Sequence, residues 1–150
     1  MPVSTDSEDA LIGSRFGIEL DGVPMAYFQS VSGFASESEV VENKVVGKDG
    51  QTVIRKIPGQ LTWAPLTLSR GLTSDMELWK WRQSVIDGDT DGMRRNGSIV
   101  MYNHNQEEVA RYNFEEAWPS KWTGPAASAD DTAVAVEELE IQYEFLERVH

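Results

Sequence analysis

The chain has 150 residues, of which 25 are acidic and 13 are basic, and its formal net charge is −12. This length suits one domain with a hydrophobic core. The negative charge argues against a surface that neutralises nucleic-acid phosphates or binds an anionic membrane. The absence of cysteine excludes disulfide bonds, thiol nucleophiles and zinc–thiolate sites, so the fold depends on packing alone.

The first thirteen residues, MPVSTDSEDALIG, are polar and acidic. We expect residues 1–13 to form a flexible N-terminal arm, followed by a single domain over residues 14–150. The arm lacks the basic start and apolar core of a signal peptide, and no later apolar run is long enough to cross a bilayer. These features predict synthesis and folding in the cytoplasm.

Two strands are predicted at the start of the domain. Phe16, Ile18 and Leu20 alternate with small or charged residues, which is typical of a half-buried strand. A turn is expected at residues 21–22, and residues 25–34 continue as the second strand.

The segment from Val40 to Gly59 predicts a hairpin, because Asp49-Gly50 favours the positive φ values of a tight turn. We expect its second arm to run to about Ile57 and to be closed by Pro58-Gly59. Neither arm has a clean apolar face, since valines share each face with charged or amide side chains. A strand half-buried on its own core should alternate, so this hairpin is expected to lie against something on both sides. Residues 61–69 read as a further strand, in which Pro65 marks an edge or a bulge.

A helix is predicted over residues 72–88, with Ser74 and Glu77 forming a capping box and Gly88 ending it. Its apolar stripe is predicted to face the core, with Trp81 at the flank of that stripe. The residues of the stripe are Leu78, Trp79, Arg82, Val85 and Ile86. The opposite side carries Glu77, Lys80, Gln83, Ser84 and Asp87.

The last third of the chain predicts more strands. Residues 98–102 and 109–114 form a hairpin around residues 104–106. The segment AWPSKWTGP is expected to break the second of these strands because it contains two prolines. After a loop over residues 123–131, a single last strand is predicted, in which Leu139, Ile141, Tyr143 and Phe145 face one way.

No group of residues predicts a catalytic or metal site. DGDTDG places Asp87, Asp89 and Asp91 at spacings found in calcium-binding EF-hand loops, but the position of the bidentate glutamate is Ser98. His104 and His150 are the only imidazoles, and neither is placed for a triad. We therefore expect no enzyme activity, no cofactor and no metal. Three tryptophans could form a sugar-stacking platform, although packing is the commoner use: Trp63, Trp118 and Trp122.

Four segments follow one another in an order that resembles a known family: FGIELDGVPMAYFQSVSGF, KIPGQLTWAPLTLSRGLTSDMELWKWRQSV, RRNGSIVMYN and VARYNFEEAWPSKWTGP. The chain after residue 13 resembles the tail tube protein family of contractile-tailed bacteriophages and phage-tail-like contractile injection systems. The positions that look like the family's pattern are Pro58, Gly59, Arg70, Gly71, Leu72, Trp79, Arg94, Arg95, Asn96, Gly97, Ser98, Trp118 and Pro119.

The resemblance implies a mainly β fold, a β-barrel or sandwich of the phage tail tube type with one flanking helix. It implies hexameric rings that stack into a rigid hollow tube, which sheath contraction drives out to deliver cargo. The implied partners are further copies of the chain, the contractile sheath protein, baseplate proteins, terminator or cap proteins, and cargo in the lumen, with no membrane binding by the subunit. Assembly would occur in the bacterial cytoplasm, and the product would be a phage-tail-like particle.

The resemblance also assigns three candidate surfaces. The hairpin would reach the neighbouring ring through Val45, Val46, Lys48, Asp49, Gln51, Val53 and Ile54. Candidates for the lumen wall are Ser36, Glu37, Ser38 and Glu39 at the root of the hairpin. Candidates for sheath contact are Glu77, Lys80, Gln83 and Asp87 on the helix.

Two alternatives stay open beside an injection-system tube. One is the tail tube of a contractile bacteriophage, which conducts DNA and is built from a subunit that forms rings and stacks in the same way. The other is a β-rich carbohydrate-binding module that works as a monomer and would use the tryptophans.

Overall fold

The computed structural model describes residues 15–90, 92–125 and 135–150. The predicted N-terminal arm, Asp91 and most of the predicted loop after Thr123 lie outside the described residues. The described elements are β1 (Arg15–Leu20), β2 (Val23–Phe28), β3 (Ser30–Ser32), β4 (Ser36–Val46), β5 (Thr52–Trp63), β6 (Leu66–Gly71), α1 (Glu77–Ile86), β7 (Arg95–Tyr102), β8 (Glu108–Thr123), β9 (Val136–Gln142) and β10 (Phe145–Arg148).

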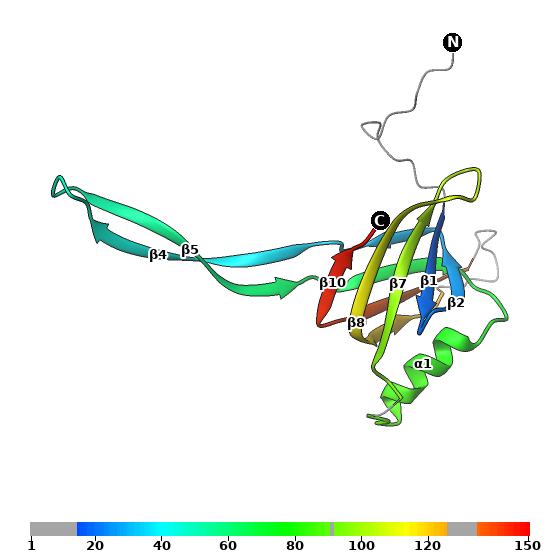
Figure 1. Cartoon of the computed structure of the whole chain (residues 1–150). Coiled ribbons are helices and arrows are strands. Elements are labelled where there is room, and N and C mark those ends of the chain that lie inside the picture. Colours follow the sequence, from blue (N-terminus) through cyan, green and yellow to red (C-terminus); the bar gives the residue numbers. More distant parts are fainter. Residues whose placement is uncertain (1–14, 91, 126–134) are drawn as a thin grey trace, which may run out of the picture.

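Eight of the strands form one antiparallel sheet that curves around the core, and the other two form a separate hairpin (Figure 1). The order in the large sheet is β2-β1-β7-β8-β9-β6-β3, and β10 also pairs with β8. The two ends of the sheet meet where β2 runs into β3, because the Gln29 N–H donates to the Ser69 carbonyl at 2.9 Å. The fold is therefore mainly β with one helix at its flank, as predicted.

The core lies inside the curved sheet and under the helix. Alternation in β1 buries Ile18 and Leu20, and alternation in β8 buries Ala110 and Phe114. The buried cluster consists of Ile18, Leu20, Phe28, Leu66, Leu68, Leu78, Trp81, Ile99, Phe114, Ala117, Leu139, Ile141 and Tyr143. Side chains from six strands, the helix and the turn after β9 thus meet in one core.

Prolines do not end strands where the sequence predicted. β5 continues through Pro58-Gly59 to Trp63, and β8 continues through Pro119 to Thr123. Each proline lies beside a shift in register, at Ser38/Val40 opposite Pro58 and at Pro119/Lys121. A bulge removes the need for a ladder N–H donor, so the strand passes through the proline.

Three other strand boundaries differ from the prediction. Residues 25–34 divide into β2 and β3 at Gln29, whose N–H bonds to a different partner strand. The predicted strand over residues 61–69 divides at Pro65, which separates β5 from β6. The predicted last strand divides between β9 and β10, and Phe145 is 42% exposed, whereas Leu139 and Ile141 are buried.

The start of the helix is not stabilised by the predicted capping box. Its N-cap position is Met76, and no side chain caps it. Asp75 Oδ1 instead accepts from the Glu77 N–H at 3.1 Å, and Thr73 Oγ1 accepts from the Asp75 N–H at 3.2 Å. These two turns satisfy the amides of Asp75 and Glu77, and Ser74 does not have the predicted capping role.

Trp81, not Trp79, is the tryptophan that the helix places in the core. Trp81 is 2% exposed and its indole N–H donates to the Met93 carbonyl at 2.7 Å. Ile86, predicted in the core stripe, is 54% exposed. The buried face is thus rotated toward Trp81, because the chain after the helix folds back over that side and supplies the indole with an acceptor.

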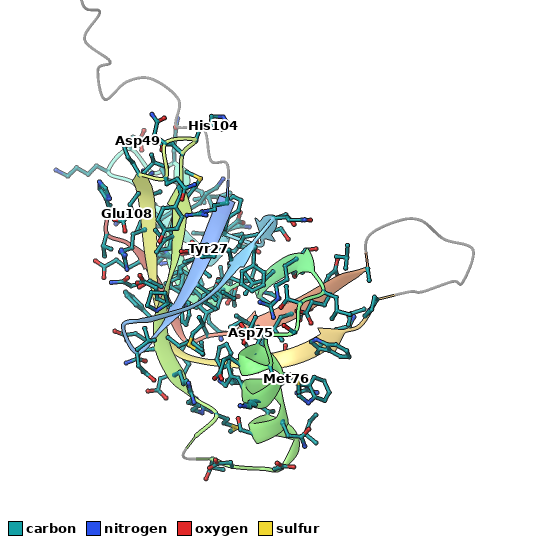
Figure 2. The ribbon with its side chains drawn as sticks, turned by 90° about the vertical axis from the view of Figure 1, so that its right-hand side faces the viewer. Tyr27, Asp49, Asp75, Met76, His104 and Glu108 are labelled. Carbon is teal, nitrogen blue, oxygen red and sulfur yellow. The ribbon has the colours of Figure 1, made fainter. Side chains whose placement is uncertain are left out.

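An ion cluster lies on β1 and β8 and includes the last described residue. Arg111 donates to Glu19 at 2.5 Å and to Glu108 at 2.7 Å, and Glu108 Oε2 lies 2.9 Å from His150 Nδ1. Figure 2 shows Glu108 near His104, at the end of the sheet where β7 turns into β8. The hydrogen bonds from Arg111 and, less strongly, from His150 lower the pKa of Glu108 below its usual 4.5, against the opposing effect of burial.

The lowered pKa of Glu108 predicts a pH-dependent contribution to stability. Because the folded pKa lies below the unfolded one, this contribution is present above pH 4.5 and is lost as the pH falls through the folded pKa. Glu108→Gln should therefore lower the free energy of unfolding at pH 7 and have a shrinking effect at acid pH. Urea unfolding at several pH values measures this. The exposed neighbour variant Glu107→Gln serves as the control and should change little; an equal loss in both variants at every pH would contradict the assignment.

Candidate functional site: assembly surfaces

The β4–β5 hairpin stands away from the rest of the protein as a long arm (Figure 1). Of its strand residues, only Val45 and Trp63 are half-buried, and all the others are exposed. Seven exposed apolar side chains lie along it: Val40, Val41, Val46, Val53, Ile54, Ile57 and Leu61. Isolated two-stranded hairpins are marginal in water, and this many exposed aliphatic side chains on one arm mark an interaction surface.

Both faces of the hairpin mix apolar and charged side chains, as predicted. On one face Val45 pairs with Val53 and Asn43 pairs with Arg55, while on the other Lys44 pairs with Ile54 and Glu42 with Lys56. A partner on one side would leave aliphatic side chains exposed on the other. The pairing therefore supports contacts on both faces.

The predicted turn lies at the tip of the arm, within a connection over residues 47–51. Asp49 Oδ1 accepts from the Gln51 N–H at 3.3 Å, and the Gly47 N–H donates to the Gln51 carbonyl at 2.8 Å. The candidate inter-ring residues Val45, Val46, Lys48, Asp49, Gln51, Val53 and Ile54 thus all lie in the distal part of the arm. Val40, Val41 and Ile57 lie in the predicted hairpin but were not among these candidates, and Leu61 was missed because the predicted hairpin ended at Pro58-Gly59.

The root of the hairpin is fixed to the body by aromatic packing. The ring of Trp63 lies 6.0 Å from that of Tyr143 and 5.9 Å from that of Phe145. The Tyr143 hydroxyl donates to the Ala64 carbonyl at 2.5 Å, and burial raises the pKa of this hydroxyl. The root therefore has a defined direction relative to the sheet.

The four lumen candidates, Ser36, Glu37, Ser38 and Glu39, begin β4 at this root and are all exposed. Exposure alone does not show that these residues line the lumen, so that role stays a prediction. A pocket of about 420 Å³ opens beside them, lined by Ala35, Ser36, Glu37, Thr62, Trp63 and Ala64. Sequence reasoning missed this pocket, because Trp63 and Ala64 follow Ala35 and Ser36 by 28 residues.

The four sheath-contact candidates lie together on the helix face that points away from the sheet. Glu77 and Lys80 form an exposed ion pair at 3.6 Å, and Gln83 donates to Asp87 at 2.9 Å. Figure 2 places Asp75 and Met76 at the start of this helix. The face is charged and mostly open to solvent, which is compatible with a reversible contact and leaves its partner a prediction.

Several family-pattern residues hold the framework together. Gly59 lies opposite the bulge of β4, where a Cβ would meet Val41 and Glu39 at 3.1 to 3.2 Å. Arg70 is 6% exposed and donates to Glu137 at 2.5 Å. Leu72 is 52% exposed, but its N–H donates to the Ala135 carbonyl at 2.9 Å.

The segment from Arg94 to Gly97 ties three strands together. Asn96 Oδ1 accepts from the Glu116 N–H at 3.0 Å, and Glu116 has a positive φ of 52°. The Asn96 carbonyl accepts from the Asp21 N–H at 2.9 Å. Gly97 leaves no room for a Cβ, which would clash with the Glu19 carbonyl and the Phe114 ring. This segment fixes the β1–β2 turn and the β8 bulge at one end of the sheet.

The other family-pattern residues join the helix region to the sheet. Arg95 begins β7 opposite Ala117, and Arg94 bonds to Glu144 at 2.5 Å. The ring of Trp79 meets that of Trp122 edge-on at 4.8 Å. Trp118 and Pro119 pair with Gln142 and Ile141 of β9, and the Pro119 carbonyl accepts from Arg82 at 3.1 Å.

The three tryptophans considered for sugar stacking do not form one platform. Trp63 packs at the hairpin root, and the Trp122 indole N–H donates to Glu137 at 3.2 Å. Among the described residues, no three His, Cys, Asp or Glu side chains are arranged to hold a metal ion. The described helix is too short and too polar to cross a membrane.

Comparisons with solved structures show the fold. The chain is similar to a chain in the sheath–tube complex of an extracellular contractile injection system, PVC, in its extended state (TM-score 0.75, 22% identity, 95% of this chain and 93% of that one covered). It is similar to a chain in the 6-fold symmetrised baseplate of the anti-feeding prophage, AFP (0.72, 19% identity, 96% and 97% covered). Hcp1 from Flavobacterium johnsoniae is more distant (0.52, 12% identity, 89% and 93% covered).

No protein with a curated description matches the sequence. The family model for the T4-like virus tail tube protein gp19, in contrast, matches residues 13–147. The match covers nearly the whole sequence and includes the hairpin, the helix and all described strands but the last residue of β10. The chain therefore belongs to the T4-like virus tail tube protein family.

Proposed function

We propose that this chain is the inner tube subunit of a contractile injection system. Six copies close into a ring, rings stack into a rigid hollow tube, and sheath contraction drives the tube out to deliver cargo. The observation that carries the proposal is the free-standing hairpin, with seven exposed apolar side chains, in a chain of the tail tube family. Burial in neighbouring copies would remove this surface from water.

The sheet edges support a closed ring. Among the described strands, β2, β3 and β10 each pair with a strand on one side only. Unpaired edges invite further strands, and a closed ring satisfies every such edge without open-ended aggregation. Each copy contacts its neighbour through two different surfaces, which is a heterologous contact. Copies joined in this way close into a ring when the rotation from one copy to the next is a whole fraction of 360°. The 6-fold symmetry of the AFP baseplate supports six as the number.

Partners follow from the assemblies in which similar chains were solved. These are a sheath–tube complex, a baseplate, a sheath/tube terminator and a tube terminating cap. The corresponding partners of this chain are its own copies, a sheath protein, baseplate proteins and a cap. Assembly takes place in the bacterial cytoplasm, and the subunit then belongs to a phage-tail-like particle. Its role is mechanical and not enzymatic.

The lumen and the outer surface have separate candidates. The segment Ser36, Glu37, Ser38 and Glu39 lies at the lumen wall in this proposal, where short and acidic side chains limit adhesion of an anionic cargo. Glu77, Lys80, Gln83 and Asp87 contact the sheath. Reversing Glu77 and Lys80 together should weaken co-sedimentation with sheath while tubes still form; unchanged sheath binding would remove this helix face from the contact.

A DNA-conducting phage tail tube is the second candidate, and the T4-like virus family match favours it. The subunit itself does not distinguish the two, since both tubes need the same stacking. The neighbouring genes do: capsid and terminase genes indicate a phage, and their absence indicates an injection particle.

Negative-stain electron microscopy of the purified protein tests the proposal. Rings or tubes are the expected result. Featureless monomers at high concentration, together with binding to a glycan array that Trp63→Ala abolishes, would instead support the carbohydrate-binding alternative.

A further inference from the structure

The pocket at the hairpin root combines a free carboxylate with an aromatic wall. Glu37 and Trp63 line it together with Ala35, Ser36, Thr62 and Ala64, and its volume is about 420 Å³. Among the described residues, the Glu37 carboxylate has neither a hydrogen bond nor an ion pair. A carboxylate beside a tryptophan ring suits a cation, which gains both an ion pair and a cation–π contact.

The distal half of the same hairpin, residues 42–56 with Lys48 at its tip, supplies cations. Between Glu42 and Lys56 the arm carries four basic and two acidic side chains, a net charge of +2. Because the whole chain carries −12, the remaining residues carry −14. The four basic side chains have no ion pair among the described residues: Lys44, Lys48, Arg55 and Lys56.

Charge is also distributed unequally along the arm. The root segments, residues 36–41 and 57–63, contain Glu37 and Glu39 and no basic residue. The hairpin is thus positive in its distal half and negative at its root. Two distal halves repel one another, whereas a distal half and a root attract.

The length of the arm separates tip from root within one chain. β4 has 11 residues, which at about 3.3 Å per residue span about 36 Å. Lys48 lies beyond one end of β4 and Glu37 at the other, so they cannot meet in the same copy. A contact between them requires a second copy.

We infer that the tip of one hairpin, led by Lys48, docks in the root pocket of another copy against Glu37 and Trp63. This deepens the proposed function, on which it rests, by naming the receiving site of the inter-ring contact. It also moves Glu37 from the lumen candidates to the contact. A tip-to-root contact is heterologous and not closed, so it repeats along one direction as ring stacking requires.

Carbodiimide cross-linking of assembled tubes tests the inference. This reagent joins a lysine amine directly to a carboxylate that touches it, so a Lys48–Glu37 product records the docked contact. Mass spectrometry of tubes, assembled from purified protein or recovered from producing cells, should find this product. Unassembled protein at low concentration should lack it, because the two side chains lie at opposite ends of the arm.

Exchanging the charges of Glu37 and Lys48 tests whether their contact contributes to tube assembly. Glu37→Lys and Lys48→Glu should each raise the protein concentration needed for tubes to pellet by roughly tenfold, since each ring repeats the lost contact. The double variant restores the pair with its signs exchanged and should recover most of this loss. Glu39→Lys is the matched control, because Glu39 is exposed on the same strand but does not line the pocket.

The outcomes separate the inference from the proposed function. Wild-type tubes in which Lys48 links only to other carboxylates, or a Glu37→Lys variant that pellets like the wild type, overturn the tip-to-root contact and leave the tube role standing. A protein that forms neither rings nor tubes under any condition overturns both. The cross-link together with recovery in the double variant supports both.

Discussion

Replacing Val45 and Val46 together by aspartate should abolish ring stacking and leave the subunit folded. Val46 is 74% exposed and Val45 is half-buried against Val53, so neither belongs to the core. Their side chains point to opposite faces of the arm, and covering both faces would bury an unpaired carboxylate on each. Each such burial costs on the order of 3 kcal/mol, and 1.4 kcal/mol is about tenfold in an equilibrium constant. Tubes should therefore be absent at concentrations at least about a hundredfold above the wild-type threshold.

Sedimentation and electron microscopy measure the loss of tubes, and circular dichroism checks the fold. The matched control is Ile86→Asp, which adds a carboxylate at an exposed aliphatic position on the helix, away from the arm. The control should still form tubes. Normal tubes from the double aspartate variant would remove the distal hairpin from the contact between rings.

Trp81→Ala should destabilise the subunit more than any other single change on the helix. Trp81 is 2% exposed and is part of the core cluster. Truncating a buried tryptophan leaves a cavity and costs about 3–5 kcal/mol. The change also deprives the Met93 carbonyl of its donor, which adds to the loss if no water replaces the indole.

Trp79→Ala provides the comparison. Trp79 is only half-buried and meets Trp122 edge-on, so its truncation should cost less than half as much. Urea unfolding followed by circular dichroism gives both values. Equal losses, or a larger loss for Trp79, would mean that the helix buries the stripe that its sequence pattern predicted.

Strands with simple alternation could be predicted from the sequence. In β1 and β8, Ile18, Leu20, Ala110 and Phe114 follow a period of two and face the core. The Asp49-Gly50 tip and the mixed faces of the hairpin were predicted for the same reason, since local turn chemistry and residue pattern decide them. The family resemblance supplied the rest of the fold class, and the described residues form the expected sheet and single helix.

The remaining details depend on contacts between distant segments. The sequence WKW places aromatic residues on both flanks of the helix, and only the return of the chain at Met93 decides that Trp81 is buried. Pro58 and Pro119 predicted breaks, but bulges let both strands continue. The root pocket needs Trp63 to be held by Tyr143, which lies 80 residues further along the chain. Contacts between residues so far apart cannot be predicted from a short stretch of sequence.

Hydrogen exchange of the hairpin amides, before and after assembly, tests most directly whether copies of this chain cover the arm. In unassembled protein, residues 40–57 should exchange rapidly, because the arm has no packed layer on either face. In tubes the same amides should exchange far more slowly, while the already protected core strands change little. Equal and rapid exchange of residues 40–57 in both states would contradict the account.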